Sequence, residues 1–148
     1  ATGHGLALPY YLSILGYVHT RMGRFQEALD TLDEGLRTVE ANDDRFQEVE
    51  LHRLKGEALL ASSADTTVEA EACFNQALAI ARRQHSKAWE LRAAMSLARV
   101  WQRTGRAGDA RTLLGYVYSS FTEGHHLPDL TEATALIAAL REPPPVLT

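Results

Sequence analysis

The sequence predicts an all-α fold in which three helical hairpins stack side by side and a single C-terminal helix covers the last hairpin. A set of small and large apolar residues recurs at intervals of 40 to 42 positions along the 148-residue chain. Between the recurrences, apolar residues are spaced three and four positions apart, which is typical of helices. No segment shows the sustained two-residue alternation of a half-buried strand. Together these observations predict a helical repeat protein.

Each repeat is anchored on an alanine that follows a turn. Ala28, Ala70 and Ala110 lie 42 and 40 residues apart, and each has companions at matching positions. The companions are Leu32, Phe74 and Leu114 four residues later, Gly35, Ala77 and Val117 seven residues later, and Gly16, Gly56 and Ala98 upstream. A single amphipathic hairpin cannot bury its apolar face, so such repeats stack on their neighbours. A glycine inside a helix costs about 1 kcal/mol relative to alanine, and we expect close helix packing to offset that cost at Gly16 and Gly56.

The apolar pattern and its boundaries predict one domain over residues 1–148, with hairpins at 7–41, 44–84 and 86–123. The expected helices span residues 7–22, 25–41, 44–61, 67–84, 86–104, 106–123 and, as the cap, 128–141. Gly23 and Gly105 follow the first and fifth helices, where glycine readily adopts the left-handed conformation of a helix end. Asn42-Asp43-Asp44 offers N-cap chemistry, and Pro128 suits a first helical turn. The prolines from Pro143 onward stop the last helix.

Composition argues against several classes of function. The net charge is −4, whereas a general nucleic-acid binder carries a basic excess. No apolar run is long enough for a membrane span, and no signal peptide is visible. The single cysteine, Cys73, cannot form an internal disulfide, which suits a reducing compartment. We therefore expect a cytoplasmic protein and, since the chain begins at Ala1 without methionine, a fragment of a larger one.

The repeat landmarks resemble the tetratricopeptide pattern W-x2-L-G-x2-Y followed by A-x3-F. The matching residues are Leu12, Leu15, Gly16, His19, Ala28 and Leu32, then Gly56, Leu59, Ala70 and Phe74, and then Leu97, Ala98, Trp101, Ala110 and Leu114. The sequence departs from the pattern because the tryptophan and the closing proline are absent and the period is about 40 rather than 34. Longer repeats of this kind are similar to the tetratricopeptide arrays of large bacterial signalling ATPases.

A narrower resemblance covers about Pro9 to Arg141. The stretches Glu50–Glu57, Ala88–Ala94 and Phe121–Leu130 are similar to the C-terminal helical region of multidomain bacterial regulators. These regulators join a class III adenylate or guanylate cyclase domain, or a DNA-binding domain, to an AAA-type ATPase. The resemblance implies a sensory or scaffolding module, and it assigns none of the cyclase or ATPase activity to this chain.

The tetratricopeptide resemblance also implies that the first helix of each hairpin lines a concave groove that binds a partner. Carried over by position, the groove residues are Tyr10, Ser13, Tyr17, Arg21, Glu50, Arg53, Glu57, Arg92, Met95, Arg99, Gln102 and Arg103. Arg92, Arg99 and Arg103 share one helix face, and with Arg53 and Arg21 they could make a basic groove. Because arginine binds carboxylates through paired hydrogen bonds, we expect an acidic peptide or another domain of the parent chain as partner. The alternatives are a solvated face of local ion pairs and an arginine-based sensor of nucleic acid or a small ligand.

No pattern in the sequence predicts catalysis, a cofactor or a metal site. A phosphate-binding loop is absent, and His125-His126 lacks the companions of a zinc site. We expect Cys73 to be a small core or interface residue and Trp101 to pack in the core, while Trp89 is as suited to a binding site as to the core. The apolar end of the stack near residues 6–20 offers a surface for a homodimer or for a preceding helix of the parent protein.

Overall fold

The computed structural model describes residues 3–42 and 45–141 and is all helical in that part of the chain, which confirms the predicted fold class. The helices are α1 (Gly3–Arg21), α2 (Phe25–Asn42), α3 (Glu48–Ser62), η1 (Ala64–Thr66), α4 (Thr67–Arg83), α5 (Lys87–Arg103), α6 (Ala107–Ser119) and α7 (Pro128–Arg141). The short η1 is a 3-10 turn in the longer connection between α3 and α4. None of the helices in the described ranges is long and apolar enough to cross a membrane.

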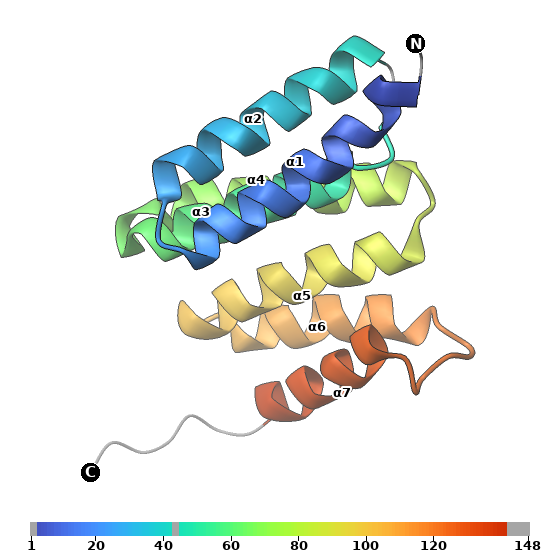
Figure 1. The fold of residues 1–148 in the computed structure, drawn as a ribbon. Coiled ribbons are helices and arrows are strands. Elements are labelled where there is room, and N and C mark those ends of the chain that lie inside the picture. The colour runs from blue at the N-terminus through green and yellow to red at the C-terminus, as the bar shows by residue number, and fades with distance from the viewer. Residues whose placement is uncertain (1–2, 43–44, 142–148) are drawn as a thin grey trace.

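The helices pack in chain order as three hairpins, α1/α2, α3/α4 and α5/α6, with α7 against the last one (Figure 1). Each second helix also packs on the first helix of the next repeat, α2 on α3 and α4 on α5. The first helices contact one another in the order α1, α3, α5 and α7, whereas α2, α4 and α6 make no such mutual contact in the described residues. The first and third hairpins likewise do not touch within these residues. This one-sided contact curves the stack toward its first helices.

The repeat landmarks form the core of the stack. Ala28, Ala70 and Ala110 are fully buried, as are the large side chains that follow each of them. A Cβ atom added at Gly16 would lie 2.6 Å from Leu32 Cγ, and one at Gly56 would lie 2.5 Å from Phe74 Cε1. No real Cβ atom tolerates such a distance, so each glycine lets the two helices of its hairpin meet. The close packing expected from the sequence is confirmed at both positions.

The predicted turn glycines end their helices. Gly23 and Gly105 have φ angles of 76° and 81°, in the left-handed region that favours glycine. The following amides, of Arg24 and Arg106, donate to the carbonyls of His19 and Trp101 at 2.9 and 2.7 Å. This pairing satisfies carbonyls that the end of a helix otherwise leaves without a partner.

Three predicted helix boundaries differ from the structure by four residues, whereas the others agree to within one residue. The first helix begins at Gly3 and carries the buried Pro9 inside it, although proline usually interrupts helices. The third helix begins at Glu48 rather than residue 44, and the expected N-cap at Asp43 and Asp44 lies outside the described residues. The sixth helix ends at Ser119 rather than residue 123, and its last turn closes through the amides of Ser120 and Phe121, which donate to the carbonyls of Val117 and Tyr118 at 3.2 and 3.1 Å.

Candidate functional site

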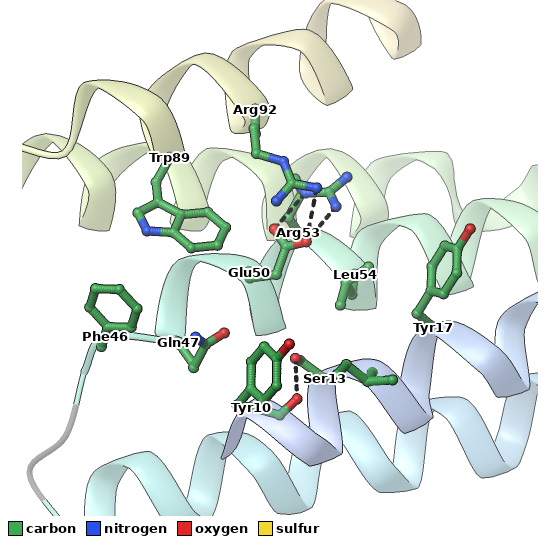
Figure 2. Close-up of a pocket in the computed structure, with 11 residues that line it drawn as sticks. Tyr10, Ser13, Tyr17, Phe46, Gln47, Glu50, Arg53, Leu54, Trp89 and Arg92 are labelled. Carbon is green, nitrogen blue, oxygen red and sulfur yellow. Dashed lines mark hydrogen bonds and ion pairs between the residues drawn. The ribbon is translucent and has the colours of Figure 1, made fainter. Parts of the chain in front are cut away.

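A concave pocket of about 560 Å³ opens on the side of the first helices (Figure 2). It is lined by α1, the segment that precedes α3, α3 itself, and the start of α5. The lining residues are Tyr10, Ser13, Ile14, Tyr17, Phe46, Gln47, Glu50, Arg53, Leu54, Trp89 and Arg92. The pocket therefore exists only because three successive hairpins are stacked in this order.

Exposed aromatic rings form two sides of the pocket. Tyr10 and Tyr17 stand on α1 with about half of each side chain exposed, at 50% and 52%. On the other side, Phe46 and Trp89 meet edge to face, with ring centroids 6.4 Å apart. The buried Leu54 of α3 lies between the two sides (Figure 2). Large half-exposed rings around a hollow are the side chains that most often anchor a bound partner.

A charged cluster crosses the pocket on α3 and α5. The nearly buried Glu50 accepts two hydrogen bonds from Arg53, at 2.8 Å from Nε and 2.7 Å from Nη2. Arg53 also reaches Ser96 at 3.3 Å and Glu57 at 3.7 Å. Burial acts to lower the pKa of Arg53, but the hydrogen bond and negative charge of Glu50, aided by Glu57, raise it above its ordinary value. Arg53 is thus a permanently charged structural partner of Glu50.

Arg92 differs from Arg53 because it is only loosely held. Its guanidinium lies 5.4 Å from the centre of the Trp89 ring. It forms ion pairs at 3.4 Å with Glu50 and at 4.0 Å with Asp129 of α7. No hydrogen bond links it to any of the described residues. Glu50 balances one of the two arginines in the pocket, so the lining carries a net positive charge and Arg92 has N–H donors left for a ligand.

A second hollow of about 320 Å³ continues the first along α1 and α3. Its lining comprises Tyr17, Thr20, Arg21, Arg53, Leu54, Glu57 and Ala61. Tyr17, Arg53 and Leu54 belong to both hollows, so together they form one groove along the first two hairpins.

The structure brings together most of the residues that the sequence placed in a groove. Tyr10, Ser13, Tyr17, Glu50, Arg53 and Arg92 line the larger hollow, and Arg21 and Glu57 line the smaller one. Arg99, Gln102 and Arg103 lie farther along α5, outside both linings. Met95 differs from the expectation most clearly, since it is buried in the core at 3% exposure.

The arginine face of α5 is largely neutralised by carboxylates. Arg99 forms an ion pair with Glu132 of α7, and Arg92 faces Asp129 of the same helix. The sequence comparison could not predict these partners, because it aligned the first helices of the three hairpins, and Asp129 and Glu132 lie on α7, outside the hairpins. Arg92 and Arg99 thus form local ion pairs, whereas no ion pair of Arg103 is found within the described residues, and Arg92 is the arginine of this face that lines the aromatic pocket.

Sequence reasoning missed Phe46 and left Trp89 undecided. Phe46 was expected inside the third helix, but it lies in the turn before that helix and is 65% exposed. The available signal was that Phe46 does not fit the helical spacing of the apolar residues that begin at Leu51. Trp89 is half-buried and touches both Phe46 and Arg92, which places it in the pocket.

The remaining candidates lie away from the pocket. Cys73 is half-buried, and burial raises the pKa of its thiol, which makes it less reactive. Trp101 packs half-buried against the core, and its indole N–H donates to Glu71 at 2.8 Å. His125 lies beside the Tyr118 ring in the loop before α7. Across the described ranges, no group of three or more His, Cys, Asp or Glu residues is placed to hold a metal ion.

No known protein-family model matches this chain, and no curated protein matches it in sequence. The tetratricopeptide and signalling-ATPase resemblances thus depend on the motifs alone.

Proposed function

We propose that this chain is a non-catalytic interaction module that binds a short peptide segment in the groove along α1, α3 and α5. The observation that carries the proposal is the pocket in which aromatic rings of α1 face Phe46 and Trp89 across the Glu50–Arg53 pair. In helical repeat proteins the concave side of the stack is commonly the binding face. A volume of about 560 Å³ accommodates a few side chains, which suits a peptide segment better than a folded domain.

The chemistry of the pocket favours a peptide that combines an apolar or aromatic side chain with a nearby carboxylate. The apolar group would lie between Tyr10 and Trp89, where both rings have exposed surface. The carboxylate would accept from Arg92, whose guanidinium has unused donors and lies 5.4 Å from the centre of the Trp89 ring. Arg53 would hold Glu50 in place, so that Glu50 does not repel the incoming acid.

The resemblance to regulator tails suggests where such a module would act. We propose that it belongs to a bacterial signalling ATPase, a cyclase fusion or a transcriptional regulator in the cytoplasm. In that setting the bound segment would come from a partner protein or from another domain of the same parent chain, and binding would report on the state of that partner.

The charges in the groove support a binding role rather than catalysis. Glu50, Arg53, Glu57 and Ser96 are joined to one another by hydrogen bonds and ion pairs. This mutual pairing fixes the side chains. The Ser96 hydroxyl, which donates to Glu57, is only 2% exposed, so a substrate undergoing acyl or phosphoryl transfer would not reach it.

The proposal can be tested by selecting ligands from a displayed library of random twelve-residue peptides with the purified 148-residue chain. We expect the selected peptides to carry Asp or Glu within a few positions of an aromatic or leucine residue. Trp89→Ala and Arg92→Gln should each weaken binding of a selected peptide by about tenfold or more, as expected for anchor residues. Arg103→Gln is the matched control, because it removes an exposed arginine of the same helix outside the pocket.

Peptides that bind equally well to the Trp89→Ala and Arg92→Gln variants would contradict the proposal. A fluorescent single-stranded oligonucleotide gives the competing test. Binding of the oligonucleotide that weakens steeply with salt, without peptide binding, would favour the nucleic-acid sensor instead.

A further inference from the structure

Helix α1 has a second exposed face, distinct from the one that lines the groove. Four apolar side chains of α1, and Met22 in the turn directly after it, follow one another at intervals of three and four residues. They are Leu8, Tyr11, Leu15, Val18 and Met22, with 40%, 63%, 44%, 41% and 57% exposure. We call this set the α1 stripe. The alternation of three- and four-residue intervals is the spacing that lets two helices pack along a common seam.

The repeat itself shows what kind of element such a stripe receives. Aligning Gly16, Gly56 and Ala98 places Tyr11 over Leu51 and Ala93, and Val18 over Ala58 and Val100. These four counterparts in α3 and α5 are at most 1% exposed. They are covered because α2 packs on α3 and α4 packs on α5. In α3 and α5 the preceding second helix covers these positions, whereas the side chains of the α1 stripe are exposed.

We infer that the α1 stripe pairs with the α1 stripe of a second copy of this chain, antiparallel and centred on Leu15. In that register Leu15 meets its own counterpart, Leu8 faces Met22, and Tyr11 faces Val18, so a two-fold axis matches apolar side chains along the whole stripe. The apolar faces of α2, α4 and α6 cannot supply the partner, because they already pack on α3, α5 and α7.

Charge does not oppose this pairing. From Ala7 to Thr20, α1 contains no Asp, Glu, Lys or Arg, so two copies can approach without like-charge repulsion along the seam. The stripe also lies beside, rather than on, the face that carries Tyr10 and Tyr17. Pairing therefore leaves both grooves open and places two binding sites on one particle, which would strengthen the capture of a two-site partner. The inference does not depend on what the groove binds.

Sedimentation equilibrium of the 148-residue chain tests the pairing directly. We expect a reversible dimer of the unaltered chain. Leu15→Glu and Leu15→Lys should each raise the dimer dissociation constant by about 100-fold or more, since two like charges would meet at the centre of the seam. Mixing the two variants should restore a dimer at least tenfold tighter than either variant forms alone, because Glu then meets Lys across the two-fold axis.

Two controls separate the seam from general effects. Val68→Glu introduces the same charge at an apolar residue of α4 that is 80% exposed, and it should leave the dimer unchanged. At a protein concentration low enough for the unaltered chain to be monomeric, melting curves of both Leu15 variants should match its own, since Leu15 is exposed in the monomer. A chain that stays monomeric at high concentration would overturn the inference and leave the stripe to a helix of another segment or protein. A dimer that survives both Leu15 substitutions, or one that mixing does not restore, would also overturn it.

Discussion

Helices α1 and α5 occupy the same place in the first and third hairpins, yet they have opposite surroundings. Helix α5 is covered by α3, α4, α6 and α7 and buries a continuous run from Ala93 to Ala98. Among the helices of the described residues, α1 packs on α2 and α3 alone, and most of its large side chains are exposed. The two helices carry the same landmarks, so the difference arises from the number of neighbours. The comparison shows that the neighbouring helices determine whether equivalent repeat positions lie in the core, in the groove or on an exposed surface.

The largest expected contrast concerns Leu97 and its counterpart Leu15. Leu97→Ala should lower the free energy of unfolding by about 3 kcal/mol, because it opens a cavity at a fully buried site of α5. Leu15→Ala should change it by less than about 0.5 kcal/mol, since Leu15 is exposed in the monomer. Urea unfolding at low protein concentration measures both values. Equal losses would show that α1 is as well covered as α5.

The next contrast concerns the small residue of each first helix, which is Gly16 in α1, Gly56 in α3 and Ala98 in α5. Alanine already occupies this place in α5, but in α1 and α3 an added Cβ atom would meet Leu32 or Phe74 within 2.6 Å. Gly16→Ala and Gly56→Ala should therefore destabilise the fold by about 1–3 kcal/mol, despite the better helix propensity of alanine. Gly56→Ala should cost more, because the Phe74 ring is rigid and the Leu32 side chain can rotate.

Gly115→Ala on α6 is the control for these substitutions. An added Cβ atom there meets nothing within 4 Å, so the helix propensity should dominate and raise stability by up to about 1 kcal/mol. Stabilisation by Gly16→Ala or Gly56→Ala would show that the helices can separate at no cost.

A smaller contrast concerns His19 and its counterpart Trp101. The Trp101 indole N–H donates to Glu71, whereas the buried Nδ1 of His19 has no hydrogen-bond partner in the described residues. Trp101→Phe should cost about 1–2 kcal/mol because Glu71 loses a donor, while His19→Leu should stabilise the fold by up to about 1 kcal/mol. Thermal melts of the two variants should shift in opposite directions. If both variants shifted the melting temperature in the same direction, the proposed difference in hydrogen bonding between Trp101 and His19 would be wrong.

The smallest expected effect is the pH dependence at His52, on the helix between α1 and α5. Burial lowers the pKa of His52 below its ordinary value of about 6.5, and this outweighs the opposing charge of Glu48. Between the folded and unfolded pKa values the unfolded chain binds more protons, so stability rises with pH in that window. Lowering the pH from 7 to 5 should therefore destabilise the protein, and His52→Gln should reduce that loss. An identical pH dependence of the two proteins would exclude this role.

The helices and the groove differ in how far the sequence predicts them. Landmarks such as Ala28 and Phe74 belong to sets that recur every 40 to 42 residues, and their burial requires only the period of a helix and a neighbouring repeat. The end of α6 escaped prediction because the apolar pattern continues to Phe121, whereas the backbone already closes a tighter last turn at Ser120 and Phe121. In the groove, the prediction for Met95 was wrong, because this side chain is buried in the core cluster that also contains Leu130 and Ala133 of α7.

By itself, the sequence determined the hairpins, their order and the sites of closest helix contact, since these follow from periodicity and from side-chain size at Gly16 and Gly56. Only the tertiary structure decided which charges and rings share one pocket. Arg92 meets Trp89, Glu50 and Asp129 because α3, α5 and α7 converge there, and Phe46 joins them from a turn. These contacts join residues that are distant in the sequence, and a one-dimensional repeat pattern contains no information about the angle and offset between stacked helices.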